Sequence, residues 1–89
     1  METGVYRHYS GRCYRVLWIA RDADTKKEMV VYQGLYHSNI LGFHPRFTRE
    51  QASFQSPVTI DGKNVTRYEY KGPFPDALKD ITDRIEVAP

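Results

Sequence analysis

The chain alternates hydrophobic and polar residues with the period of two that is typical of β-strands, apart from its last fifth. Residues 12–20 place Tyr14, Val16 and Trp18 on one face and Cys13, Arg15, Leu17 and Ile19 on the other. Because residues 17–19 are apolar on both faces, we expect a central strand that is covered on both sides. The polar segment 21–27 predicts a hairpin loop, which leads into a second strand over residues 28–36.

The middle of the chain is less regular, but it contains two recognisable local signals. Thr48-Arg49-Glu50-Gln51 fits the Ser/Thr-x-x-Glu/Gln capping box and predicts that a short helix opens there. Asp61-Gly62 is a favoured pair for a two-residue hairpin turn, because both of its positions need positive φ. We therefore predict a second hairpin, with strands at 58–60 and 63–70.

The chain changes character after Gly72. Phe74, Leu78, Ile81 and Ile85 recur at helical spacing and predict a short amphipathic helix that docks on the β domain or on a partner. We therefore divide the chain into a β domain, residues 1–72, and a helical extension, residues 73–89. About five short strands joined by tight turns indicate a mainly β fold, a small SH3-like β-barrel or roll with a C-terminal helix. An open α+β sheet is the alternative.

Composition is that of one small globular domain, with 89 residues, 40% of them hydrophobic. Charge is uneven along the chain: residues 1–73 hold eleven Lys and Arg against seven Asp and Glu, whereas residues 74–89 hold two against four. The basic body favours an anionic partner, but its excess of four charges is small for a dedicated nucleic-acid surface.

Cysteine content and hydropathy narrow the class of protein further. Cys13 is the only cysteine, which excludes an internal disulfide and a Cys-rich metal site. The opening residues lack an apolar signal segment, and no apolar run is long enough to span a bilayer. We therefore expect a reduced, soluble, cytoplasmic protein without a membrane partner.

The opening stretch GVYRHYSGRCYRV, residues 4–16, carries a resemblance to a known family. It is similar to the Gly-x-Tyr-Arg-His-Tyr-x-Gly-x-x-Tyr-x-Val opening of the bacterial domain of unknown function 1653, DUF1653. Residues 20–25, 29–36 and 54–68 resemble that family's polar hairpin, second strand and closing hairpin, so the resemblance covers residues 4–70. It implies an SH3-like barrel and a bacterial source, with no activity assigned.

The chain departs from the family at one place. Members carry an Arg-Pro pair ahead of the phenylalanine that corresponds to Phe54. Here either His44-Pro45 replaces that pair, or Arg49-Glu50 aligns with it and the proline is lost. The acidic extension after Gly72 is an addition to the common domain.

Aromatic and basic residues of the opening hairpin form the candidate site. Tyr6 and His8 share one face of the predicted strand, while Arg7 and Tyr9 share the other. An arginine fork beside tyrosine rings suits a carboxylate, a phosphate or a peptide. The predicted ligand-binding residues, including the segment that closes one side, are Tyr6, Arg7, His8, Tyr9, Tyr14, Arg15, Arg46 and Arg49. The alternative is structural, with tyrosines capping the core and arginine stems packed along them.

These residues predict a non-enzymatic binding module for a small anionic molecule, a peptide or a protein, in a chain that is a monomer or a homodimer. Arg7→Ala is then expected to abolish binding while the melting temperature barely moves. Nucleic acid is the alternative partner, because small barrels stack bases on aromatic rings beside basic side chains. A third hypothesis is an interaction protein whose tail helix docks a neighbouring chain.

Catalytic and metal sites are disfavoured. Cys13 and His8 have no third group to orient them as a nucleophile and base, and Cys13 shares a face with Leu17 and Ile19. The spacings of His8, His37 and His44 match no metal motif. The paired aspartates lie in a polar turn and on the wet face of the predicted helix. We therefore expect no catalytic residue, no metal and no cofactor.

Overall fold

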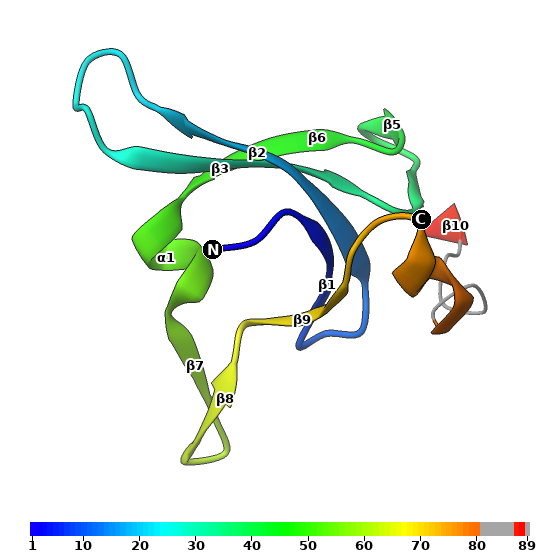
Figure 1. Ribbon diagram of the computed structural model, residues 1–89. Helices are drawn as coiled ribbons and strands as arrows, with labels where there is room; N and C mark the ends of the chain where they lie inside the picture. The colour runs from blue at the N-terminus through cyan, green and yellow to red at the C-terminus, as the bar shows by residue number, and fades with distance from the viewer. Residues whose placement is uncertain (81–86, 89) are drawn as a thin grey trace.

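Five antiparallel strands form the main sheet, in the order β6-β3-β2-β1-β9. Their bounds are β1 Gly4–His8, β2 Cys13–Arg21, β3 Glu28–Gly34, β6 Arg46–Glu50 and β9 Tyr68–Gly72. The structure is a computed structural model that describes residues 1–80 and 87–88. In Figure 1 the sheet curls from β6 at the top, through β3 and β2, to β1 and β9 below. This arrangement confirms a mainly β fold.

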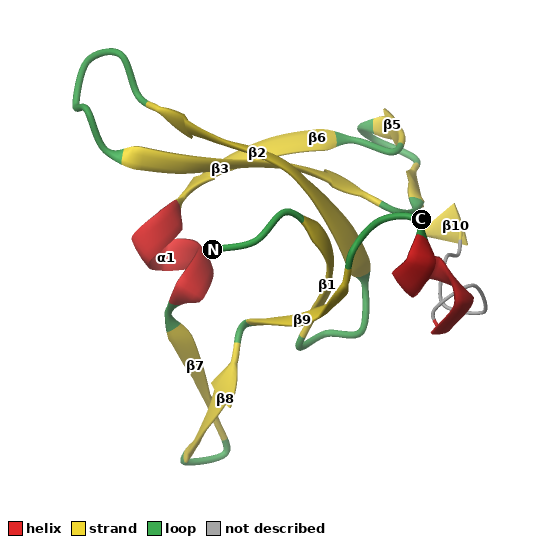
Figure 2. Cartoon of the chain, in the orientation of Figure 1, coloured by secondary structure: helices red, strands yellow, loops and turns green. Residues whose placement is uncertain are grey.

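Short elements complete the chain (Figure 2). Helix α1, Gln51–Gln55, follows β6 and leads into a separate hairpin of β7, Pro57–Ile60, and β8, Lys63–Thr66. A small second sheet joins β4, His37–Ser38, to β5, Gly42–Phe43, and to β10, Val87–Ala88. One 3-10 helix, η1, spans Asp76–Asp80. No helix in the described part of the chain is long and apolar enough to span a lipid bilayer.

The sheet has a buried cluster on each face. The concave cluster is aromatic and contains Tyr6, Val16, Val30, Tyr32, Phe54 and Tyr68. Phe54 anchors α1 there, stacked on the Tyr68 ring at 3.9 Å between centroids. The opposite cluster contains Val5, Cys13, Leu35 and Ala77, with Phe74 and Leu78 packed beside them. Because successive side chains of β1 and β2 point to opposite faces of the sheet, these two strands contribute residues to both clusters.

Both predicted hairpin turns are confirmed, and each has a local cause. In the loop after β2, the Asp22 carboxylate accepts backbone hydrogen bonds from Asp24 and Thr25, at 2.9 and 2.8 Å. Asp61 and Gly62 both adopt positive φ, 50° and 79°, as a two-residue turn between antiparallel strands requires. The predicted strand over 63–70 divides into β8 and β9 at Arg67.

Two local predictions are wrong. The predicted short helix is present as α1, but the capping box does not form, because Thr48 lies in β6 and α1 begins after Glu50 without any side-chain capping bond. Residues 17–19 are not covered on both sides: Trp18 is 66% and Ile19 36% exposed. A register shift between Val16 and Trp18 bends β2 there, and the β2–β3 hairpin then projects past the body of the protein (Figure 1).

The C-terminal helix is only partly described. Of the predicted helix, the structure shows η1, a 3-10 helix, and residues 81–86 lie outside the described residues. Ala77 and Leu78 pack on Val5 and Cys13, so this part of the tail docks on the chain's own β domain. The edge strands β6 and β9 form no ladder with each other among the described residues. The SH3-like barrel therefore stays a prediction.

Candidate ligand-binding site

The predicted site residues divide between the two faces of the sheet. Pairing of β1 with β2 places Tyr6 opposite Tyr14 and Arg7 opposite Cys13. Directly opposed residues of an antiparallel pair point to the same face. Tyr6, His8 and Tyr14 therefore share the concave face, whereas Arg7 and Arg15 lie with Val5 and Cys13 on the other.

Arg15 and Arg46 are separated from the concave face. The Arg15 guanidinium stacks on the Phe74 ring, 3.6 Å from its centroid, which holds the start of the tail against the sheet. Arg46 is exposed and pairs with Gln33, which itself pairs with Arg15, so these three share a face. The structure therefore does not bring Arg15 and Arg46 together with His8 and Tyr14.

Arg7 and Tyr9 border a shallow depression of about 260 Å³ beside β8 and β9, lined also by His8, Val65, Thr66 and Glu69. Tyr9 is 48% exposed, and its ring lies 4.2 Å from the His8 ring. Tyr6 is buried, and its hydroxyl donates to the Glu2 carbonyl oxygen at 2.6 Å. Tyr6 is thus part of the core and does not line this depression.

The remaining predicted residues, His8, Tyr14 and Arg49, meet in a second depression, which we call the tyrosine cavity. Its volume is about 330 Å³. Strands β1, β2, β3, β4, β6 and β9 and the loops beside them supply its walls. The lining residues are His8, Arg12, Tyr14, Tyr32, Tyr36, Ser38, Leu41, Phe47, Arg49 and Tyr68.

Two pairs of phenol hydroxyls and one guanidinium organise this cavity. The Tyr14 and Tyr36 hydroxyl oxygens are 3.1 Å apart, and those of Tyr32 and Tyr68 are 3.3 Å apart. Arg49 donates from Nε to the Tyr32 hydroxyl at 3.4 Å and from Nη1 to the Ser53 hydroxyl at 3.1 Å. The hydroxyls are therefore held by one another and by Arg49.

Edge-to-face contacts hold the rings of the cavity in place. The Tyr14 ring lies 5.5 Å from each of the Tyr32 and Tyr36 rings and 5.7 Å from the Tyr68 ring. The Arg12 guanidinium lies 5.0 Å from the centroid of the Tyr36 ring. Such contacts restrict ring rotation, so the polar groups are positioned before any ligand arrives.

Burial sets the protonation of the cavity. Burial raises the pKa of Tyr14 most, and the hydrogen bond with Tyr36 raises it further. Burial also raises the pKa of Tyr68. The hydrogen bond to Tyr32 raises the pKa of Arg49. At neutral pH Tyr14 and Tyr68 therefore keep their protons and Arg49 keeps its charge.

His8 is the exception, because its pKa is lowered below the ordinary value of 6.5. Burial is the main cause, followed by the positive charges of Arg67 and Arg49. Its Nδ1 accepts a hydrogen bond from the Ser10 backbone N–H at 3.1 Å. The neutral ring therefore carries its proton on Nε2 and offers one more donor.

Sequence reasoning missed most of this wall. Tyr32 and Tyr36 lie in the predicted second strand, residues 28–36, but the predicted site is centred on the opening hairpin and does not include them, nor Arg12, Phe47 and Tyr68. One signal was available in Gly34. A Cβ on Gly34 would lie 2.5 Å from the Tyr36 ring, so glycine at this position lets that ring lie across β3.

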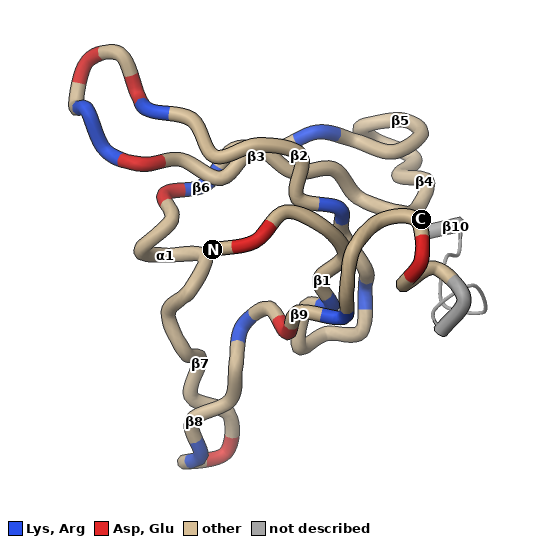
Figure 3. Tube along the Cα trace, viewed as in Figure 1, with Lys and Arg blue, Asp and Glu red and all other residues tan. Residues whose placement is uncertain are grey.

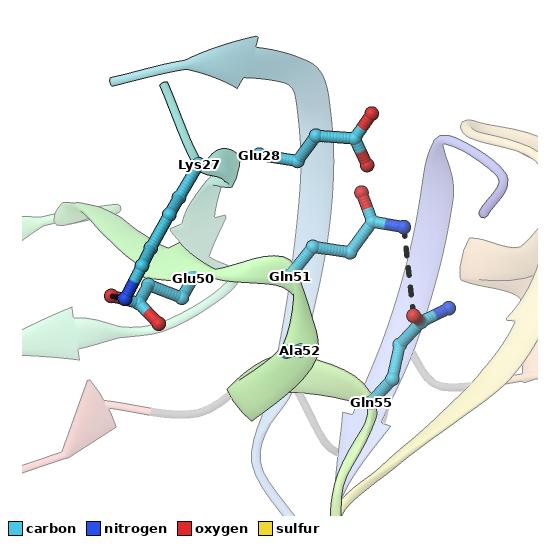
Figure 4. Close-up of a pocket in the computed structure, with 6 residues that line it drawn as sticks. All are labelled: Lys27, Glu28, Glu50, Gln51, Ala52 and Gln55. Carbon is cyan, nitrogen blue, oxygen red and sulfur yellow. Dashed lines mark hydrogen bonds and ion pairs between the residues drawn. The ribbon is translucent and has the colours of Figure 1, made fainter. Parts of the chain in front are cut away.

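A larger depression, of about 490 Å³, lies between the β2–β3 hairpin and α1 (Figure 4). Four of its polar side chains form two pairs, although Gln51 Oε1 is buried without a hydrogen-bond partner among the described residues. Lys27 Nζ lies 3.5 Å from a Glu50 carboxylate oxygen, and Gln51 donates to the Gln55 side-chain carbonyl at 3.5 Å. It contains no aromatic ring and none of the predicted site residues. Its chemistry therefore provides less for a ligand than the smaller tyrosine cavity.

The histidines do not assemble a metal centre within residues 1–80 and 87–88. That part of the chain holds no group of three or more His, Cys, Asp or Glu side chains placed to bind a metal ion. His44 instead stacks on Phe43, at 3.9 Å between ring centroids. Cys13 is 1% exposed and belongs to the second core, as expected from its strand face.

Comparison with known proteins gives a family and a fold. Residues 4–70 match the sequence profile of the family described as protein of unknown function (DUF1653). A crystal structure of a DUF1653 protein from Bordetella bronchiseptica is similar to this chain, with 33% sequence identity and a TM-score of 0.72. The similarity covers 82% of this chain and 90% of that one. Comparison with curated proteins gave no match.

Proposed function

This chain belongs to the DUF1653 family, and from its tyrosine cavity we propose that it is a non-catalytic binding module for an oxyanion, either a carboxylate or a phosphate. The single observation that supports this is an excess of hydrogen-bond donors. Arg12, Arg49 and neutral His8 line the cavity and each carries N–H donors, whereas none of the lining residues is Asp or Glu.

The phenol pairs add further donors. Each pair has two hydroxyl protons, and one hydrogen bond between the oxygens uses only one of them. The second proton of each pair is available to an acceptor from outside. A ligand that brings oxygen acceptors and negative charge satisfies these donors, whereas a cation meets two guanidinium groups.

The lining residues contribute to anion binding in different ways. Arg49 supplies charge from a position fixed by Tyr32 and Ser53, and Arg12 supplies a second charge from above the Tyr36 ring. Tyr14, Tyr32 and Tyr68 supply hydroxyls and flat walls. A non-catalytic role fits a lining that holds neither cysteine nor carboxylate and a single histidine, His8.

Within residues 1–80 and 87–88, the basic residues are spread over separate elements of the chain (Figure 3). Figure 3 shows Lys and Arg on several separate elements, with acidic residues beside them in the β2–β3 hairpin and at the β7–β8 turn. A nucleic acid that binds through phosphates needs several cations along one path. This distribution favours a small or terminal anion over a nucleic-acid strand.

A pair of variants tests the proposal. Sulfate and benzoate are titrated into the protein while backbone amide chemical shifts are followed by NMR. Wild type should show saturable shifts at residues that line the tyrosine cavity. Arg49→Ala should remove saturation, and Arg7→Ala, on the opposite face, should not. If Arg7→Ala abolishes binding and Arg49→Ala retains it, the site lies on the other side of the opening hairpin and the tyrosine cavity is not the site.

A further inference from the structure

A patch of apolar side chains projects from the hairpin that joins β4 to β5. Ile40 is 90% exposed, Leu41 60% and Phe43 73%. Isolated exposed apolar residues are common, but three within four positions of one hairpin are a concentrated apolar surface. We call these three residues the apolar tip.

The apolar tip has a defined conformation. The Ser38 hydroxyl oxygen accepts hydrogen bonds from the backbone N–H groups of Ile40 and Leu41, at 3.3 and 3.1 Å. Gly42 has a φ of 92°, which turns the chain back into β5. The His44 N–H donates to the Tyr36 carbonyl at 3.0 Å and ties the returning chain to the end of β3. The tip is therefore anchored beside a tyrosine of the cavity.

The apolar tip and the tyrosine cavity share a wall. Ser38 and Leu41 both line the cavity, with Tyr36 and Arg12 among its other walls. A molecule that leaves the cavity past Leu41 therefore passes from charged and hydroxyl donors directly onto exposed apolar carbon. The head of such a ligand meets hydrogen-bond donors, and its body meets hydrocarbon.

We propose that the ligand is amphiphilic: an oxyanion head, such as a carboxylate, that carries an apolar chain longer than the cavity can hold. The head lies between Arg49 and the phenol hydroxyls, and the apolar body lies on the tip. This inference rests on the proposed function, because it assumes that the head binds in the tyrosine cavity. Each methylene that becomes buried on the tip should then strengthen binding by up to about fourfold.

A homologous series of ligands tests this. Sulfate serves as a head without a body, and butanoate, hexanoate and octanoate are titrated below their micellar concentrations by NMR. In wild type the affinity should rise at each step of chain length. Ile40→Ser and Phe43→Ser should flatten that rise and leave sulfate affinity unchanged. Ile60→Ser, which alters an exposed apolar residue on the separate β7–β8 hairpin, should keep the full rise.

The outcomes separate this inference from the proposed function. If sulfate and butanoate bind but affinity does not grow with chain length, or if the tip variants keep the full rise, the amphiphilic ligand is wrong and the oxyanion site stands. If no anion binds, both fail. Light scattering of the free protein tests whether a second copy of the chain occupies the apolar tip instead. A dimer that Phe43→Ser dissociates would assign the tip to that second copy and overturn the inference.

Discussion

Arg49 and Tyr32 are joined by a hydrogen bond of 3.4 Å from the guanidinium Nε to the phenol oxygen, across the antiparallel pair of β6 and β3. Through Tyr32 the contact continues to the Tyr68 hydroxyl on β9. One guanidinium thus holds a chain of hydroxyls that reaches from one edge strand of the sheet to the other. This bridge brings one of the two guanidinium groups of the cavity lining into contact with its hydroxyls.

Arg49→Lys tests whether the fixed N–H donors of the guanidinium contribute to anion binding beyond its positive charge. Lysine keeps the positive charge but cannot bind Tyr32, Ser53 and an anion with fixed geometry. We expect sulfate affinity to fall by about tenfold, as for the loss of one charge-assisted hydrogen bond, while urea unfolding shows only a small change. The measurement is calorimetric titration of both proteins. Equal affinity in the two would show that charge alone accounts for the role of Arg49.

His8 gives the protein a pH dependence. Its pKa in the folded chain lies below 6.5, so an unfolded chain takes up the proton first as pH falls. The free energy of unfolding should therefore decrease as pH falls below about 6.5 and level off below the folded pKa, whereas above 6.5 His8 has no effect. Urea unfolding of wild type and His8→Gln between pH 8 and pH 5 measures this difference.

A bound anion should reverse that trend. Sulfate keeps its charge over this range and stabilises a positive His8, so its affinity should increase as pH falls through the same window. His8→Gln should show a flatter profile. A wild-type profile that matches the variant would place His8 outside the anion site.

Gly34→Ala should push the Tyr36 ring out of place, because the added carbon would lie within 3.0 Å of three atoms of that ring. Overpacking of this kind costs about 1–3 kcal/mol in the free energy of unfolding. The Tyr14–Tyr36 hydrogen bond should break, so anion affinity should fall as well. Gly62→Ala is the control: it strains the β7–β8 turn, where nothing lies within 4 Å of the added carbon, and should leave affinity unchanged. Equal loss of affinity in both would point to general instability.

Phe54→Ala should be severe for so small a domain. Phe54 is 1% exposed, stacks on Tyr68 and makes edge contacts with Tyr6 and Tyr32. Truncation of a buried phenylalanine costs about 3–5 kcal/mol, a large share of the stability of a typical domain. Urea unfolding by circular dichroism should show a much lower midpoint. A change of less than 1 kcal/mol, within the range for ordinary surface substitutions, would mean that α1 does not anchor the concave core.

Cys13 should be protected from thiol reagents in the folded protein, because it is 1% exposed beneath Ala77 and Leu35. Labelling with a chromogenic disulfide should be slow in buffer and fast in urea. Deletion of residues 74–89 should make it fast in buffer too, since Phe74, Ala77 and Leu78 leave with the tail. Rapid labelling of the intact chain would show that the described part of the tail does not cover this core.

The sequence by itself determined the strands of the opening and of the two hairpins, the two hairpin turns and the family, because these depend on local alternation, on residues that tolerate positive φ and on a contiguous opening motif. It did not predict β6, which carries Arg49. It also placed Tyr6 and His8 on one face and Arg7 on the other. Only the tertiary structure decided which face carries the candidate site. Arg49 joins Tyr32 across one strand pair and, through it, Tyr68 on a distant strand, and Arg15 is drawn to Phe74 by the tail. Such contacts follow from strand order and sheet curvature, which residue periodicity does not encode.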